Sequence, residues 1–535
     1  MYSTFSSSCS SSFSSTHSIR TPGLWVAAIV AASLAAPVTA SAEQVGLDVR
    51  LVNPVMKAGQ KETNYLRISL TGFDMEAQEQ RSPVNVAIVL DHSGSMQGDK
   101  LEQAKRAAIT AVDRLSDQDI VSVVIYDSNV EVLVPATKAV DRDQIKSAIR
   151  KISAGSSTAL FAGVSKGGAE VRKFLQSQCV NRVILLSDGL ANVGPDSPQD
   201  LEGLGRSLMK EDISVTALGL GLGYNEDLMV ALASVGGGNH AFIESADDLV
   251  GIFNKEFDGL LSVVANQFEI EVQLADSVRP VRMVGCDGDI EGRSIRIPLA
   301  QLYAQQERYF VVEVEVDPGE SGTTRPVADV EVSYQNLQTQ TRDMLASHVE
   351  VRFSESTAAV QSALDVETYA YCMLQLSNER NRHATALRDA GEVEKAQELL
   401  NLNAQVLNEV ELQCEANGLT ELGAKLGKVE ESNDYQARVI ADESKWNYSR
   451  KGMRALQNSL QQQQTYSGIR ADVQVHSKQG DAKVNVELKG GGGGSAPIQS
   501  GPLQFSLPSL KIGTLRSLPQ SATSVPADDD SSVKP

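Results

Sequence analysis

The chain has 535 residues, which is more than one hydrophobic core organises, so we expect two to four domains. Its 41% hydrophobic and 22% charged residues are ordinary for a protein that folds in water. The formal net charge of −20 argues against a nucleic-acid-binding protein, because binding phosphates needs a basic surface.

The first 42 residues are typical of an export signal rather than of a folded segment. A polar, Ser-rich start precedes an apolar segment from Leu24 to Ala36, which is short for a membrane span. Ala40-Ser-Ala42 then gives the small-x-small pattern of a signal cleavage site, so the mature chain is expected to begin near Glu43. A retained N-terminal anchor is the alternative. The sequence predicts a secreted, periplasmic or cell-envelope protein with no membrane span in the mature chain.

Strand-like alternation occurs on both sides of the central part of the chain. Residues 46–51 and 65–70 alternate apolar with polar side chains, and the pattern returns at 268–274, 308–316 and 327–334. Two strands alone do not make a stable sheet, so we expect residues 43–83 and 266–353 to complete one β-sandwich. The alternative is that the early strands pack elsewhere.

Helical and strand patterns alternate in the central part, residues 84–265. Apolar runs are expected to form strands, and amphipathic stretches to form the helices between them. This alternation predicts a doubly wound α/β domain, with a mostly parallel sheet and helices on both faces. Right-handed crossovers bring the carboxyl ends of several strands to one edge, where such sheets keep their ligand sites. The expected strands are 86–90, 120–126, 130–134, 183–187 and 214–220, and the expected helices are 100–115, 142–151, 160–175, 201–210 and 247–264.

Side chains with oxygen atoms follow two of these strands and precede one helix. The first strand ends in the sequence Asp-His-Ser-Gly-Ser, a later one ends in Ser-Asp-Gly, and a threonine stands in a small-residue loop between them. Carboxylate and hydroxyl oxygens are hard ligands, which favour magnesium or manganese over zinc or copper. The same residue types also cap turns and helix starts, which is the alternative reading of each cluster alone. The candidate metal ligands are Asp91, Ser93, Ser95, Thr158 and Asp188.

In residue type and order these five residues resemble the metal-ion-dependent adhesion site of the von Willebrand factor type A (VWA) domain. The resemblance covers residues 84–265 and continues through glycines at 219–223 and 236–238. It implies a Rossmann-like α/β fold that holds one divalent cation, Mg²⁺ or alternatively Mn²⁺ or Ca²⁺. In that family the two Ser and the Thr reach the metal directly, while one or both Asp act through water. The resemblance therefore implies a cation whose shell is completed by an Asp or Glu of a partner protein.

Three function classes follow from this resemblance. The first is a non-enzymatic, cation-dependent protein-binding or adhesion protein. The second is a hydrolase that uses the cation as a Lewis acid, which would need a general base that the sequence does not offer beside the ligands. His92 adjoins Ser93, but neighbouring side chains at a strand end point apart. The third is an assembly or regulatory subunit with a purely structural metal. We expect the first class, and no enzyme.

The hydrophobic period changes from 2 to 3.6 after residue 353, which predicts a helical region over 354–465. The sequence Ala390-Gly-Glu392 separates two apolar stripes and predicts an αα-hairpin, and a further helix is expected over 435–464. Residues 466–535, with a run of glycines at 490–494, are poor in apolar side chains and are expected to form a linker and disordered tail.

Four cysteines lie outside the expected signal segment. Cys372 and Cys414 stand at comparable distances from the predicted hairpin turn, so they are the pair best placed to form a disulfide. Export would permit such a bond. Four buried free thiols are the alternative.

Overall fold

The computed structural model describes residues 44–75 and 81–463. The expected signal segment, 1–42, and the expected tail, 466–535, lie outside this range. Within the described residues, no helix combines the length and the apolar character that a membrane span requires.

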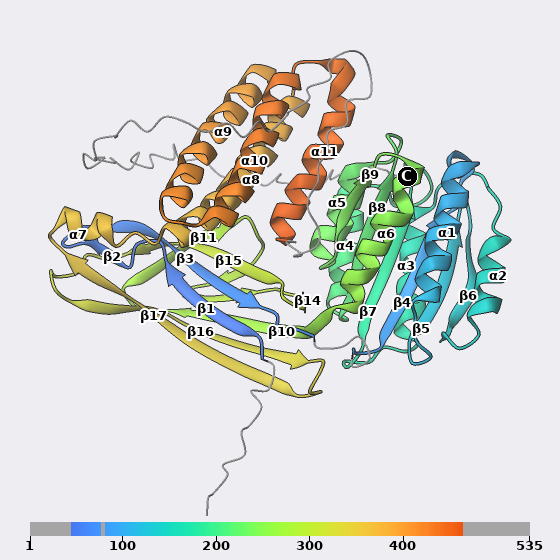
Figure 1. Ribbon diagram of the computed structural model, residues 1–535, viewed down its shortest axis with the longest axis horizontal. Coiled ribbons are helices and arrows are strands. Elements are labelled where there is room, and N and C mark those ends of the chain that lie inside the picture. The colour runs from blue at the N-terminus through green and yellow to red at the C-terminus, as the bar shows by residue number, and fades with distance from the viewer. Residues whose placement is uncertain (1–43, 76–80, 464–535) are drawn as a thin grey trace, which may run out of the picture. The chain divides into compact units, whose positions relative to one another are not determined.

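The central α/β domain is built on a six-stranded sheet in the order β6-β5-β4-β7-β8-β9 (Figure 1). Every pair is parallel except β5 with β6, which confirms the prediction of a mostly parallel sheet. Four of the strands, β4, β5, β7 and β8, are buried along their whole length, which explains their continuous apolar runs. The strands are β4 (Val84–Asp91), β5 (Ile120–Tyr126), β6 (Val130–Lys138), β7 (Val180–Ser187), β8 (Ile213–Leu220) and β9 (His240–Ile243).

Helices cover both faces of this sheet, as the doubly wound pattern predicts. Val86 and Ile88 of β4 point into the core under α1, α2 and α6, whereas Ala87 and Val89 point into the core under α3, α4 and α5. Successive side chains of a strand point to opposite faces of the sheet, so the one strand contributes to both cores. The helices are α1 (Asp99–Asp113), α2 (Arg142–Arg150), α3 (Leu160–Arg172), α4 (Pro198–Met209), α5 (Glu226–Val235) and α6 (Ala246–Leu261), and a 3-10 turn, η2, spans Gly94–Met96.

Strands from before and after the α/β domain share two further sheets. β3 pairs along its length with β15, and β2 pairs with β17. The α/β domain is therefore inserted between strands of a β-sandwich. The first sheet has the order β1-β3-β15-β11, from β1 (Gly46–Leu51), β3 (Glu62–Thr71), β11 (Val278–Val284) and β15 (Glu307–Val316). The second has the order β12-β13-β10-β16-β17-β2 with β14 beside β10, from β2 (Val55–Lys57), β10 (Val263–Leu274), β12 (Asp289–Glu291), β13 (Ser294–Ile297), β14 (Gln301–Tyr303), β16 (Thr324–Asn336) and β17 (Arg342–Ser354).

The C-terminal region is helical, as predicted, but it is divided more often than the apolar stripes indicate. Asp365 accepts a hydrogen bond from the Thr368 backbone amide and begins a helix in the middle of the first apolar stripe, residues 359–373. Asp442 caps another helix in the same way, so the helix expected over 435–464 begins at Glu443, and residues 435–439 belong to the helix before it. Gly391, with φ +84°, makes the turn of the αα-hairpin. The helices are α7 (Thr357–Ser362), α8 (Val366–Asp389), α9 (Val393–Ala416), α10 (Thr420–Val439) and α11 (Glu443–Gln462).

The disulfide expected between Cys372 and Cys414 is absent, and both side chains are buried free thiols. They belong to one apolar cluster shared by α8, α9 and α10. Cys414 faces Gly423 of α10, where an added Cβ would lie 3.6 Å from the Cys414 Cβ. Burial raises the pKa of both thiols, that of Cys414 to about 11, so both act as small apolar side chains of the helix packing.

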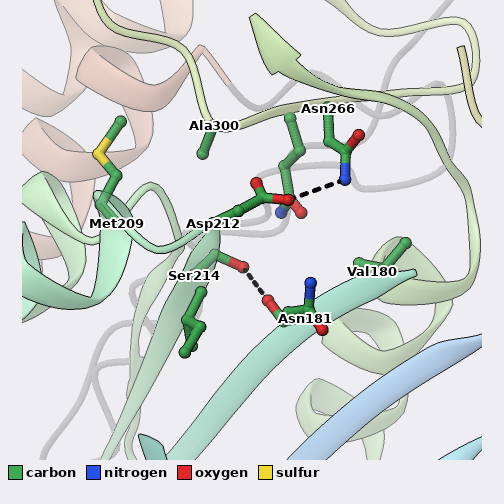
Figure 2. Close-up of a pocket in the computed structure, with 9 residues that line it drawn as sticks. Val180, Asn181, Met209, Asp212, Ser214, Asn266 and Ala300 are labelled. Carbon is green, nitrogen blue, oxygen red and sulfur yellow. Dashed lines mark hydrogen bonds between the residues drawn. The ribbon is translucent and has the colours of Figure 1, made fainter. Parts of the chain in front are cut away.

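A small polar pocket lies at the amino ends of β7 and β8, where the α/β domain meets β10 (Figure 2). The Asn266 amide donates to the Asp212 carboxylate at 3.1 Å, and the Ser214 hydroxyl donates to the Asn181 carbonyl at 3.3 Å. Burial raises the pKa of Asp212 to about 7. The Asn266–Asp212 hydrogen bond connects the α/β domain to the sandwich, at the edge opposite the carboxyl ends of the strands.

Candidate metal site

Asp91 is a fully buried carboxylate at the end of β4. Because β4 and β7 pair in parallel, the last residue of β7, Ser187, lies beside it. The Ser187 hydroxyl donates to one Asp91 oxygen at 2.5 Å, and the Ser93 backbone amide donates to the other at 2.8 Å. Burial raises the pKa of Asp91, and these hydrogen bonds act in the opposite direction. These two bonds therefore hold the Asp91 carboxylate in one orientation at the start of the loop that follows β4.

The two serines of that loop extend the oxygen cluster toward β7. The Ser93 and Ser95 hydroxyl oxygens lie 3.1 Å apart, and the Ser95 hydroxyl donates to Asp188 at 2.6 Å. Ser93 and Asp188 are buried, whereas Ser95 is exposed. The cluster is therefore anchored in the domain and open to solvent on the Ser95 side.

Thr158 comes from the loop before α3, which is tied to the β4 loop by backbone hydrogen bonds. The Gly155 amide donates to the His92 carbonyl at 2.6 Å, and the Gly94 amide donates to the Ser156 carbonyl at 2.8 Å. A Cβ added at Gly189 would lie 3.0 Å from the Thr158 hydroxyl oxygen and 3.5 Å from that of Ser95. The two hydroxyls therefore border the same glycine, and all five candidate ligands lie at one edge of the sheet.

The donor set fits a small divalent cation. It consists of hydroxyl and carboxylate oxygens, and the distances between neighbouring oxygens are 2.6 Å for Ser95 to Asp188 and 3.1 Å for Ser93 to Ser95. An octahedral shell with metal–oxygen distances of about 2.1 Å places neighbouring oxygens about 3 Å apart. Ser93, Ser95 and Thr158 would hold the ion directly, with Asp91 and Asp188 behind them.

Lys100, which the sequence did not single out, also belongs to this site. It stands in the first turn of α1, and its ammonium group donates to the second Asp188 oxygen. Its side chain is 36% exposed, while that of Asp188 is fully buried. Lys100 therefore offsets part of the negative charge that would otherwise attract a metal ion.

Asp127 and Asn192 position the Thr158 loop and were also missed from the sequence. The Asp127 carboxylate accepts from the backbone amides of Asn129 at 2.8 Å and Ser156 at 3.2 Å, and these bonds lower its pKa. The Asn192 side chain accepts from the Thr158 backbone amide at 2.8 Å. Asp127 directly follows β5, so its place at a strand end was the available signal.

Two exposed leucines stand next to the oxygen cluster. Leu190 is 57% exposed and follows Gly189, which borders Thr158. Leu222 is 50% exposed and follows Gly221, whose added Cβ would lie 3.9 Å from the Lys100 amino nitrogen. The polar site therefore has apolar side chains at its margin.

Sequence relatives share this domain. The matching family is the von Willebrand factor type A domain, over residues 85–255. An uncharacterized protein of Synechocystis is 26% identical over 353 residues, which are 64% of this chain and 82% of the relative. The uncharacterized protein YfbK of Escherichia coli is 26% identical, over 44% of this chain and 41% of its own length. Human inter-alpha-trypsin inhibitor heavy chain H3 is 28% identical, over 36% of this chain and 22% of its own length. This chain therefore spans less than half of the length of the last two relatives.

Two solved structures share the fold over a larger part of the chain. A von Willebrand factor type A protein from Catenulispora acidiphila aligns with a TM-score of 0.57 and 16% identity, over 71% of this chain and 88% of that structure. The ArnB paralog VWA2 from Sulfolobus acidocaldarius aligns with a TM-score of 0.52 and 16% identity, over 78% of this chain and 98% of that structure. These two structures show the same fold, and the family match places a von Willebrand factor type A domain at residues 85–255 of this chain.

Proposed function

We propose that this protein binds a partner protein through a divalent cation, and that the partner supplies an Asp or Glu carboxylate to the metal. The charge of the site carries this proposal. Asp91 and Asp188 contribute −2, Lys100 contributes +1, and a divalent ion adds +2, so the loaded site has a net charge of +1. Since three of the donors are neutral hydroxyls, the ion keeps an attraction for a further anionic oxygen.

The surroundings of the site support a protein partner. Ser95 is exposed, so an incoming carboxylate can reach the ion, which a closed structural metal site would prevent. Leu190 and Leu222 offer apolar surface beside it for the residues that flank the carboxylate. A partner that binds here would cover both kinds of surface.

A metal-dependent hydrolase has less support. Two titratable groups beside the ligands are already used in positioning: Asp127 accepts backbone amides, and the His92 ring nitrogen lies 2.9 Å from the Ser153 carbonyl. A general base would have to be free to take a proton from the attacking water. We therefore infer a binding function, with Mg²⁺ as the expected ion and Mn²⁺ or Ca²⁺ as alternatives.

An exported location is part of the same proposal, and it rests on residues 1–42. N-terminal sequencing of the protein from its native source is expected to begin at or near Glu43. A chain that keeps Met1 in its mature form would contradict export by cleavage.

The binding proposal is tested by selecting displayed random peptides on the immobilised protein in magnesium, with counter-selection on Thr158→Val. We expect the enriched peptides to contain an Asp or Glu whose change to Asn or Gln abolishes binding. We also expect EDTA to release them, and the matched variant Ser157→Ala, in the same loop, to bind them as the parent does. Peptides that bind without an acidic residue, or equally well in EDTA, would contradict the proposal.

A further inference from the structure

The last described helix, α11, makes a charged contact with the VWA domain. The Arg450 guanidinium donates to Glu226 at 2.5 Å and to Asp227 at 2.8 Å, and it also contacts Asp389 of α8 at 2.7 Å. Lys451 donates to Glu226 and, at 2.7 Å, to the Tyr224 carbonyl. These groups join the C-terminal helices to the start of α5.

This contact is buried, unlike the surface ion pairs of the chain. Lys451 is 1% exposed and Glu226 is 6% exposed. Burial acts to raise the pKa of Glu226, but its bonds to Lys451 and Arg450 lower it, so the carboxylate is ionised in the contact. Removing one partner of a buried pair leaves an uncompensated charge. The geometry of the Tyr224–Asp227 segment therefore depends on α11.

The same segment continues directly into the metal site. Gly223 packs on Asp188: an added Cβ at this glycine would lie 2.9 Å from the Asp188 carbonyl oxygen. The Tyr224 ring lies against Gly219 at the end of β8, where an added Cβ would fall 2.3 Å from the ring. The Lys451 ammonium lies 4.3 Å from the centre of that ring. An unbroken series of contacts thus leads from α11 through Tyr224 and Gly223 to Asp188.

We propose that Lys451 and Arg450 are positioning residues of the metal site, which fix the 221–224 loop against Asp188 so that metal affinity depends on the docking of α11. This inference rests on the proposed function, because it assumes that the site binds a cation. Since coupling between two sites is reciprocal, metal binding is also expected to alter α11.

The chain carries a natural probe of this helix. It contains two tryptophans, Trp25 in the expected signal segment and Trp446 in α11. The Arg388 guanidinium lies 4.9 Å from the centre of the Trp446 ring, so displacement of α11 changes the surroundings of the indole. In the full chain with Trp25→Phe, tryptophan fluorescence therefore reports on α11 alone.

The test is a magnesium titration of this Trp25→Phe parent, followed by calorimetry and by Trp446 fluorescence. We expect Lys451→Met to weaken magnesium binding by about 5- to 150-fold, which is the usual range of coupling, and Lys451→Arg to restore part of it. Arg282→Gln is the matched control, because it removes an ion pair between β11 and Glu379 of α8 without touching the VWA domain. Its magnesium affinity should equal that of the parent.

Equal magnesium affinity in Lys451→Met and the parent would overturn the positioning role. If Lys451→Met does not fold, the magnesium titration of the Trp25→Phe parent is the test. A change in Trp446 fluorescence with the same midpoint as the calorimetric curve supports the proposal. Constant fluorescence at saturating magnesium overturns it. A parent that binds no magnesium at all contradicts the proposed function itself, so the two failures are distinguishable.

Discussion

The two edges of the VWA sheet use polar residues in opposite ways. At the amino edge, charged groups have protein partners: Asp119 accepts from Arg81 at 2.9 Å and from the Val84 amide at 2.9 Å, and buried Arg182 donates to Tyr303 at 2.6 Å and to Ser214 at 3.0 Å. At the carboxyl edge two carboxylates meet three hydroxyls and the ammonium of Lys100. Polar residues at a strand end therefore do not by themselves mark a site. We infer the metal site from the excess of negative charge among converging oxygens.

Removing the carboxylates at one edge should abolish metal binding, whereas removing one at the other edge should not. In the combined variant Asp91→Ala with Asp188→Ala, calorimetry is expected to detect no bound magnesium, because both anionic groups behind the hydroxyls are lost. The matched change at the amino edge, Asp119→Asn, breaks the pair with Arg81, so it should lower the thermal midpoint and leave the magnesium stoichiometry unchanged. Undiminished stoichiometry in the combined variant would place the metal elsewhere.

Neutralising Lys100 should sharpen the contrast between the edges by increasing the excess negative charge at the carboxyl edge. Lys100→Gln removes the cation that contacts Asp188, so magnesium should bind roughly tenfold more tightly, as expected for one charge-assisted hydrogen bond. Calorimetry at two salt concentrations measures the effect, which should shrink at the higher one. Weaker binding would mean that Lys100 supports the loaded site rather than competing with the metal.

The smallest expected effect is a pH-dependent change in the thermal stability of the chain, caused by Asp212 at the amino edge. Burial raises the pKa of Asp212 from 3.8 to about 7, so the folded chain binds this proton more tightly than the unfolded chain. Stability is then lost as the pH rises from about 4 to about 7, and Asp212→Asn avoids this loss. The variant should gain about 2–4 °C in thermal midpoint at pH 8.5 and nothing at pH 4.

The Asp212→Asn change is conservative for the backbone, because Asp212 has φ +60° and Asn tolerates this region. The control is Asp276→Asn, which makes the same change at a side chain that is 92% exposed. A constant difference between Asp212→Asn and the parent across this range would show that Asp212 is ionised in the folded chain.

Features that depend on local pattern could be predicted from the sequence. Strands buried on both faces appear as apolar runs, and the residues that end β4 and β7 converge because those strands are parallel neighbours. Asp127 was missed because an acidic residue after a strand usually makes a turn, which is also what it does here. Its role in holding Thr158 depends on a loop that lies 29 residues further along the chain.

Contacts between residues that lie far apart in the sequence could not be predicted from local sequence patterns. Lys100 was expected to be an ordinary residue of the first helical turn, and its contact spans 88 residues. Lys451 stands in a helix rich in Gln, Arg and Lys, which indicates a solvent-exposed face, yet it is buried against Glu226, 225 residues away. The break between α10 and α11 was missed because Asp442, rather than Gly or Pro, marks it.

The most direct test of the central claim is a crystal structure of the protein grown with manganese, with the ion located by its anomalous scattering. The proposed cation site predicts one strong peak per chain at the carboxyl edge of the VWA sheet. The hydroxyl oxygens of Ser93, Ser95 and Thr158 should lie within about 2.5 Å of it. A peak at any other position, or none at the carboxyl edge with manganese in excess, would contradict it.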